Sequence, residues 1–293
     1  MKQRSVIITQ HAKLSYSANS MVVQTMMDIN YVPIDDIYLI IVQTTRAVLT
    51  TELINQISQH QIKLVFTDSS GQPICETVNY YSNNQTVSTL TSQVNWDTGQ
   101  KETLWTQLVK TKIQNQITNL KTHDLEYKDL NKQLDAVKSN DSTNREAVVA
   151  RSYFVRLFGE TFVRKQETPI NAALNYGYSI ILAEINRNIV ANGYTPTIGI
   201  HHHREDNHFN FGSDLIEPFR PIIDDWISNQ KFYEFTSDIK FGLVRLLSAE
   251  VRYQGRSMYL NNAVTQYVMD CVKFLNGKKE MTTIELELIG YEV

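Results

Sequence analysis

The stretch KETLWTQLVKTKIQNQITNLKT, residues 101–122, marks the point at which the sequence changes from a strand pattern to a helix pattern. Its apolar side chains recur every three to five positions, at Trp105, Leu108, Ile113, Ile117 and Leu120. Apolar residues at this spacing lie on one face of an α-helix. The stretch therefore predicts a long amphipathic helix at the start of a helical half of the chain.

The sequence after this stretch keeps the helical period. Its patterns predict a short helix around residues 130–137 and longer ones over 143–162, 169–193, 214–228, 237–250 and 257–275. The helix from Pro169 has clear boundary signals, because Thr168 is a capping residue, proline suits the first helical position, and Gly193 suits the end. We therefore expect residues 101–293 to form a larger, all-helical C-terminal domain.

The sequence before residue 80 has a strand pattern. Short β-rich runs predict strands at Val6–Thr9, Lys13–Ser17, Met21–Thr25, Tyr38–Val42 and Lys63–Thr67. One helix is expected at about residues 52–60, with Thr51 as its cap. Residues 81–100 are polar and have no strong period, which is typical of a linker. The predicted fold class is α+β: a small N-terminal β-rich domain (1–80), a linker (81–100) and a helical catalytic domain (101–293).

The composition is that of an ordinary globular protein, because 42 % of the residues are hydrophobic and only 20 % are charged. The longest apolar run, Ile37 to Val42, is far too short to cross a membrane, and we expect a cytoplasmic protein. Cys75 and Cys271 have no metal-like spacing, so we interpret both as buried or incidental thiols.

The charge is unevenly distributed, although the net charge is only −3. Residues 101–165 contain twelve Lys/Arg and eight Asp/Glu, whereas residues 166–293 contain eleven and sixteen. A basic segment next to an acidic, histidine-bearing one is compatible with a phosphate-binding face beside a metal site. Random surface charge explains the same numbers, and composition alone favours that interpretation.

Histidines and carboxylates gather after residue 200. Four of the seven histidines lie within eight residues, His201, His202, His203 and His208, and Asp214 and Glu217 follow. Imidazole nitrogens and carboxylate oxygens together suit a divalent cation with open coordination positions. Such an ion activates a phosphodiester towards attack. The alternative is that the histidines are solvated and that Asp214 only caps a helix.

Glu146 has two possible roles. Thr143 and Glu146 are spaced as in a capping box, in which the glutamate binds the backbone at the helix start. Ala150 and Tyr153, however, lie on the same side of the predicted helix, next to its apolar stripe. The carboxylate can therefore also point inward, and the residue types alone favour the cap.

Several motifs taken together resemble one known family. They are residues 171–178 (NAALNYGY), 193–196 (GYTP), 199–202 (GIHH) and 214–221 (DLIEPFRP), preceded by 32–37 (VPIDDI) and 110–116 (KTKIQNQ). In order and spacing they are similar to the CRISPR-associated adaptation integrases, the Cas1 family. The chain's length and the glutamate at position 217 look most like the type II branch.

The resemblance implies a function and a site. It implies a metal-dependent DNA endonuclease and integrase that joins the 3′ ends of captured DNA to a CRISPR repeat by transesterification. Glu146, His202 and Glu217 then hold Mg²⁺ or Mn²⁺, and counting from Gly199 selects His202 among the three adjacent histidines. Many relatives have aspartate in place of Glu217.

The resemblance also implies partners: DNA (the captured fragment and the repeat), a homodimer, and a small second adaptation protein. A type II system adds a ring-shaped accessory protein and the interference nuclease. The residues alone are also compatible with two other functions. One is a general metal-dependent nuclease, and the other is a catalytically silent DNA-binding scaffold.

Overall fold

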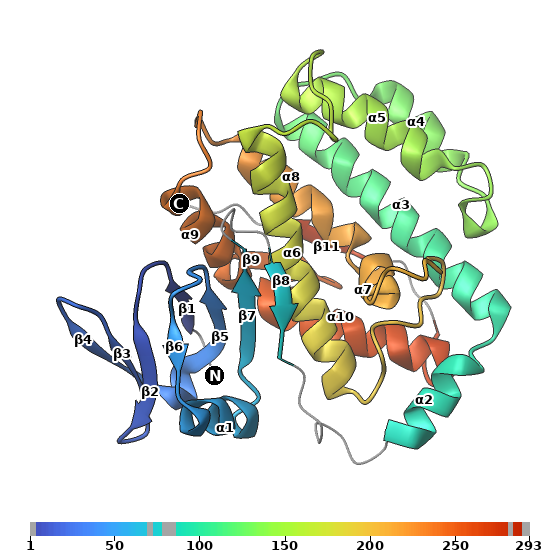
Figure 1. Ribbon diagram of the computed structural model, residues 1–293. Helices are drawn as coiled ribbons and strands as arrows, with labels where there is room; N and C mark the ends of the chain where they lie inside the picture. The colour runs from blue at the N-terminus through green and yellow to red at the C-terminus, as the bar shows by residue number, and fades with distance from the viewer. Residues whose placement is uncertain (1–3, 69–72, 78–85, 281–283, 289–293) are drawn as a thin grey trace. The chain divides into compact units, whose positions relative to one another are not determined.

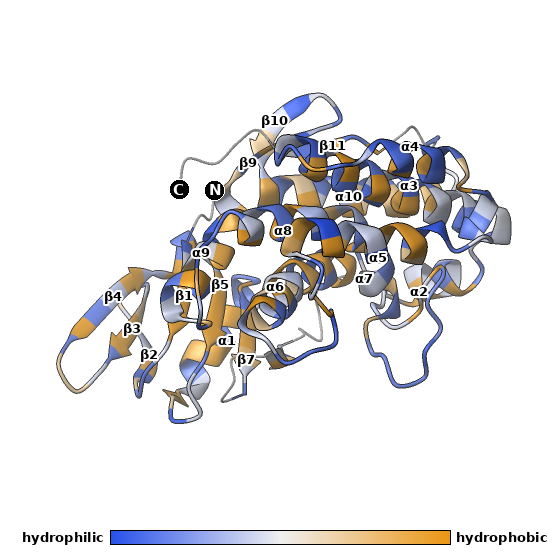
Figure 2. Ribbon diagram, turned by 90° about the horizontal axis from the view of Figure 1, so that it is seen from above, coloured by the Kyte–Doolittle hydropathy of each residue, from blue (hydrophilic) through white to orange (hydrophobic). Residues whose placement is uncertain are grey.

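The β5 strand, Ile37–Val42, is buried along its whole length and forms the centre of the N-terminal part (orange in Figure 2). The computed structural model describes residues 4–68, 73–77, 86–280 and 284–288. These residues divide into two units, 1–82 and 83–293, each with its own internal packing. The fold class is α+β, as predicted.

The described residues of unit 1 form two four-stranded sheets, one α-helix and a short 3-10 helix at Ile34–Asp36. Their elements are β1 (Arg4–Ile8), β2 (Lys13–Ser17), β3 (Ser20–Gln24), β4 (Ile29–Pro33), β5, β6 (Val48–Leu49), α1 (Thr51–Gln59), β7 (Lys63–Thr67) and β8 (Pro73–Glu76). One sheet has the order β1-β5-β7-β8 and the other β4-β3-β2-β6. The strands β1, β5 and β7 pair in parallel, so β5 has a strand on either side.

The five predicted strands of unit 1 are present within one or two residues, but the cap of α1 differs and the strands β4, β6 and β8 were not predicted. The cap of α1 is Thr50 and not Thr51, because the Thr50 hydroxyl accepts the backbone N–H of Leu53 at 3.3 Å. The strand β4 was not predicted. It is the exposed edge of its sheet, with Ile29 55 % and Tyr31 63 % exposed, so its pattern reflects no buried face.

Unit 2 is mostly helical. Its helices are α2 (Thr86–Val94), α3 (Thr98–Thr122), α4 (Lys128–Asp135), α5 (Arg145–Phe158), α6 (Pro169–Ala191), α7 (Asn210–Leu215), α8 (Arg220–Ser228), α9 (Ser237–Arg245) and α10 (Leu260–Leu275). The helix α3 packs against α4, α5, α8 and α10, and α6 crosses α10 (Figure 1). In the described residues, no helix is long and apolar enough to span a membrane.

The described part of the expected linker, residues 86–100, is mostly helical, because α2 ends at Val94 and α3 begins at Thr98. Residues 81–85 lie outside the described ranges. The sequence pattern misses α2 because Val87 and Val94 are largely exposed and form no buried stripe. A polar residue holds the helix instead. Gln93 is fully buried, and its amide donates to the carbonyls of Thr195 and Ile198, each at 2.9 Å.

The C-terminal part also contains a small sheet that the helical patterns did not predict. It has the order β10-β9-β11, from Glu250–Tyr253 (β9), Arg256–Tyr259 (β10) and Leu286–Leu288 (β11). A turn at Gln254 and Gly255, both with positive φ, joins the first two strands. The helix predicted over 257–275 therefore begins only at Leu260.

Candidate active site

A lysine of α3 bridges two of the predicted site residues. The Lys112 ammonium donates to Glu146 Oε1 of α5 and to Glu217 Oε2, which precedes α8. The three side chains come from distant parts of the chain, and Lys112 and Glu217 are both nearly inaccessible to solvent. The structure therefore brings Glu146 and Glu217 to one place, with a cation between them.

Glu146 is not part of a capping box. The helix α5 begins after Asn144, whose side chain makes no cap, and the Asp141 carboxylate accepts the backbone N–H groups of Arg145 at 2.8 Å and Glu146 at 3.0 Å. Since Asp141 serves these donors, the Glu146 side chain is free to turn inward to Lys112. Of the two roles, the inward one is the one observed.

His202 is oriented by a buried carboxylate. Asp214, which has no exposed surface, binds the Nδ1 atom of His202 at 2.6 Å. The same carboxylate accepts the backbone N–H groups of Ile200, His201 and His202 at 2.7–3.1 Å. Because Nδ1 is bonded to Asp214, Nε2 is the ring nitrogen of His202 that remains available to a ligand. His202 lines a cleft together with Glu146 and Glu217.

The other two neighbouring histidines lie elsewhere. The ring of His201 stacks on Trp105 of α3, with centroids 4.0 Å apart and an interplanar angle of 5°. An extended backbone would place His201 and His203 on the same side, but residues 200–202 wrap around one carboxylate. His201 is therefore only partly exposed, whereas His203 is exposed.

Neighbouring charged side chains shift the pKa values of the site residues. Burial opposes the ionised form of Glu217, but the cations of Arg220 and Lys112 outweigh it and lower the pKa of Glu217 to about 2. Burial lowers the pKa of Lys112, and Glu217 and Glu146 more than reverse that effect, so its pKa is raised. The Asp214 hydrogen bond raises the pKa of His202. Lys112 and Glu217 are therefore both charged at neutral pH.

These groups line a cleft of about 270 Å³. The residues around it are Trp105, Lys112, Gln116, Glu146, Ala150, Phe154, Arg164, Tyr178, His202, Glu217, Arg220 and Asp224. Arg220 donates to Glu217 at 2.9 Å and lies over the Tyr178 ring at 4.6 Å. The Tyr178 hydroxyl donates to Asp224, and burial raises the pKa of Asp224 to about 7.

The donor set fits a divalent metal ion in its chemistry. Two carboxylates and an imidazole with its other nitrogen held by an aspartate form a typical set for such an ion. In the part of the chain that the structure describes, no three such side chains lie close enough to hold an ion as they stand. Lys112 supplies the positive charge between the carboxylates, so an ion has to replace its ammonium.

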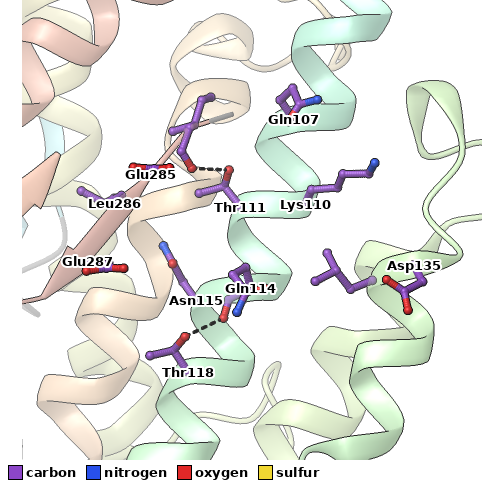
Figure 3. A pocket seen from close by; sticks show the side chains of 12 residues that line it. Gln107, Lys110, Thr111, Gln114, Asn115, Thr118, Asp135, Glu285, Leu286 and Glu287 are labelled. Atoms are coloured by element: carbon purple, nitrogen blue, oxygen red, sulfur yellow. Dashed lines mark hydrogen bonds between the residues drawn. The ribbon is translucent and has the colours of Figure 1, made fainter. Parts of the chain in front are cut away.

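A second, larger cleft of about 600 Å³ lies elsewhere along α3 (Figure 3). Amide and hydroxyl side chains of α3 line it together with residues of β11, and Thr111, Asn115 and Thr118 lie on the side of the strand. Its acidic groups, Asp135, Glu285 and Glu287, are all exposed. This cleft lacks the buried carboxylate–histidine arrangement of the first.

The sequence patterns missed Lys112, Tyr178 and Asp224 as members of the site. Lys112 and Tyr178 both lie in stretches that resemble the family, 110–116 and 171–178. The resemblance marked these stretches but did not indicate that the two side chains belong to the site. Asp224 follows the last motif by three positions, and its spacing alone does not distinguish it from an exposed aspartate.

Comparison with known proteins agrees with these motifs. A family model described as CRISPR associated protein Cas1 matches residues 5–231. The chain belongs to the Cas1 family. A curated Cas1 relative, the CRISPR-associated endonuclease Cas1 of Neisseria meningitidis serogroup C (strain 8013), is 32 % identical over 275 residues, which cover 92 % of this chain and 90 % of the relative.

Solved structures share the Cas1 fold. A casposase bound to integration product has a TM-score of 0.78 at 19 % identity, covering 95 % of this chain and 92 % of its own. A Cas6-RT-Cas1–Cas2 complex has a TM-score of 0.73 at 14 % identity, covering 95 % of this chain and 35 % of its own. At these identities the similarity is one of fold.

Proposed function

We propose that this Cas1-family chain is a metal-dependent DNA endonuclease and integrase of CRISPR spacer acquisition. It joins the 3′ ends of captured DNA to the repeat by transesterification. The observation that carries the proposal is the convergence of Glu146, Glu217 and the Asp214-oriented His202 on one cleft. The names of the relatives agree, since one is an endonuclease and another is bound to its integration product.

The reaction exchanges one phosphodiester for another. The 3′ oxygen of the captured fragment forms a bond to a phosphorus of the repeat, and the bond from that phosphorus to its own 3′ oxygen breaks. One proton leaves the attacking hydroxyl and one returns to the leaving oxygen. A bound Mg²⁺ or Mn²⁺ supplies charge stabilisation and lowers the pKa of the attacking hydroxyl.

The side chains of the cleft divide the work. Glu146, Glu217 and His202 are the proposed ligands, and Asp214 keeps the proton of His202 on Nδ1, so that Nε2 is available as a ligand atom. The guanidinium groups of Arg220 and Arg164 line the cleft beside them. Fixed cations at this place stabilise the negative charge that develops on the attacked phosphate.

The proposed partners are DNA, a second copy of this chain and a Cas2-type second adaptation protein. A structural neighbour contains Cas1 together with Cas2, and another holds DNA product. The excess of Lys/Arg in residues 101–165 provides charge for DNA phosphates. The similarity to the meningococcal relative supports the type II branch, in which a ring-shaped accessory protein and the interference nuclease are further partners.

The decisive experiment is a strand-transfer assay with the Cas2 protein, fragment DNA and a repeat-bearing target. We expect joined products that require Mg²⁺ or Mn²⁺ and disappear with a chelator. Cut but unjoined DNA would instead indicate a general metal-dependent nuclease. DNA binding without any metal-dependent product would indicate a catalytically silent scaffold.

A further inference from the structure

Three buried polar atoms at the catalytic cleft have no partner. Among the described residues, five buried side-chain atoms lack a hydrogen bond, and three of them are Gln116 Nε2, Gln116 Oε1 and Asp224 Oδ2. Both residues line the cleft of about 270 Å³, and Gln116 is only 1 % exposed. Three of these five atoms therefore lie at the cleft of the proposed active site.

An unsatisfied amide at this place is costly for the resting protein. More than nine in ten buried polar groups in proteins have a hydrogen-bond partner, and a group without one destabilises the fold. Gln93 shows the usual situation, because it is equally buried and its amide is bonded to Thr195 and Ile198. Gln116 therefore has hydrogen-bonding capacity that a ligand in the cleft can use.

The chemistry of the free atoms restricts that ligand. The amide offers both a donor and an acceptor, whereas phosphate oxygens only accept, and the guanidinium groups of Arg164 and Arg220 in the same cleft are the more suitable donors for them. In DNA, the groups that donate are the edges of the bases and a terminal hydroxyl. A base edge carries a donor and an acceptor side by side, which a glutamine amide can bind in pairs.

The walls of the cleft also suit a base. Trp105, Phe154 and Tyr178 line it. Phe154 is half-buried, so its ring can be reached, and it is stacked on Phe162 at 5.6 Å between centroids. Proteins bind unpaired bases by combining aromatic side chains with hydrogen bonds to the base edge.

We propose that Gln116 hydrogen-bonds the edge of the terminal, unpaired base of the DNA strand whose 3′ end enters the cleft, and so positions that end and selects its base. The inference rests on the proposed function for the identity of the substrate. Lys112 lies one helical turn before Gln116 on α3, and its ammonium crosses to both carboxylates. If a bound ion took the place of this ammonium, Lys112 could move away and the strand could reach the amide.

The test is binding of an unreactive strand. A short single-stranded DNA with 2-aminopurine at a 3′-deoxy terminus cannot attack, and its fluorescence reports stacking of the terminal base. In the presence of Mn²⁺, we expect Gln116→Met to lower the affinity for this strand about tenfold. A tenfold change in affinity corresponds to about 1.4 kcal/mol. The melting temperature should stay the same or rise, because methionine removes the unsatisfied amide.

Two comparisons make the outcome specific to the base. Gln114→Met is the matched control, because Gln114 is exposed on the same helix and lines the other cleft (Figure 3). With an abasic terminal nucleotide, the wild-type protein and Gln116→Met should bind equally. Equal loss with and without the base would overturn the proposal, as would unchanged binding of the 2-aminopurine strand by Gln116→Met.

A terminal hydroxyl is the other donor in DNA, and the 3′-deoxy strand separates it from the base. If Gln116→Met weakens binding only of strands that carry the 3′ hydroxyl, the amide does not read the base and the proposal is wrong. Strand transfer by the wild-type protein is measured independently. Its absence would refute the proposed function, whereas base-dependent binding through Gln116 would still be detected.

Discussion

Asp214 holds His202 at two points: its carboxylate accepts the backbone N–H of His202 at 3.0 Å and binds the ring Nδ1 at 2.6 Å. A side chain fixed at both ends loses little further freedom when it binds an ion. The relationship also distinguishes His202 from His201 and His203, and it leads to the first of five predictions.

Alanine substitution of the three histidines, one at a time, should have three different results. His202→Ala should abolish strand transfer, and His203→Ala should leave it unchanged. His201→Ala should retain activity but lower the free energy of unfolding by about 1 kcal/mol, because it removes the ring stacked on Trp105. Activity and melting are measured on the same samples. Loss at His203 with full activity at His202 would show that the assignment is off by one.

Glu146→Ala and Glu217→Ala should each abolish strand transfer, because a hard divalent ion needs their oxygens. Their effects on stability should differ, since the Glu146 side chain is 27 % exposed and that of Glu217 only 8 %. Loss of Glu217 leaves Arg220 without its carboxylate and Lys112 with Glu146 alone, and it should cost roughly 3–5 kcal/mol. Glu217→Gln keeps the packing and serves as control. Retained activity in Glu146→Ala would exclude it as a ligand.

Lys112→Met should increase the affinity for Mn²⁺. The substitution removes the ammonium that an ion must replace and leaves two carboxylates facing each other. In chelator, the melting temperature should fall below that of the wild-type protein, and Mn²⁺ should raise it by more than it raises the wild type. Titration calorimetry measures the affinity directly. An unchanged affinity would mean that the ion binds elsewhere.

Asp224 should make stability fall as pH rises. Burial raises its pKa in the folded protein to about 7, so the folded state keeps a proton that the unfolded chain loses near pH 4. Between these two pH values, this group lowers the free energy of unfolding by about 1.4 kcal/mol for each unit by which the pH rises. Asp224→Asn removes this dependence. Denaturant unfolding at pH 5 and pH 8 should show a smaller difference for the variant, and equal differences would contradict the raised pKa.

DNA affinity should depend strongly on salt, and the protein should be a dimer. Each phosphate contact releases counterions, so the logarithm of the binding constant should fall linearly with the logarithm of salt concentration. Fluorescence anisotropy at several salt concentrations measures the slope. A binding constant unaffected by salt would exclude a role for the basic segment 101–165, and a monomer in light scattering would exclude the dimer.

The sequence by itself determined the succession of elements where a regular pattern of buried side chains exists. The buried stripe of α3, the cap and proline at the start of α6, and most strands of unit 1 follow from local periodicity. Elements held by other means were missed. The helix α2 depends on Gln93 and its bonds to residues 195 and 198, which no local pattern contains.

Only the tertiary structure decided how the site is arranged. The residue types allowed Glu146 either to cap α5 or to face inward, and the contact with Lys112, 34 positions away, shows the inward role. The carboxylate of Asp214 imposes a bend on residues 200–202 that no local rule predicts, and this bend separates His202 from His201. Local periodicity follows from neighbouring residues, whereas a buried charge is placed by partners that lie far away in the sequence.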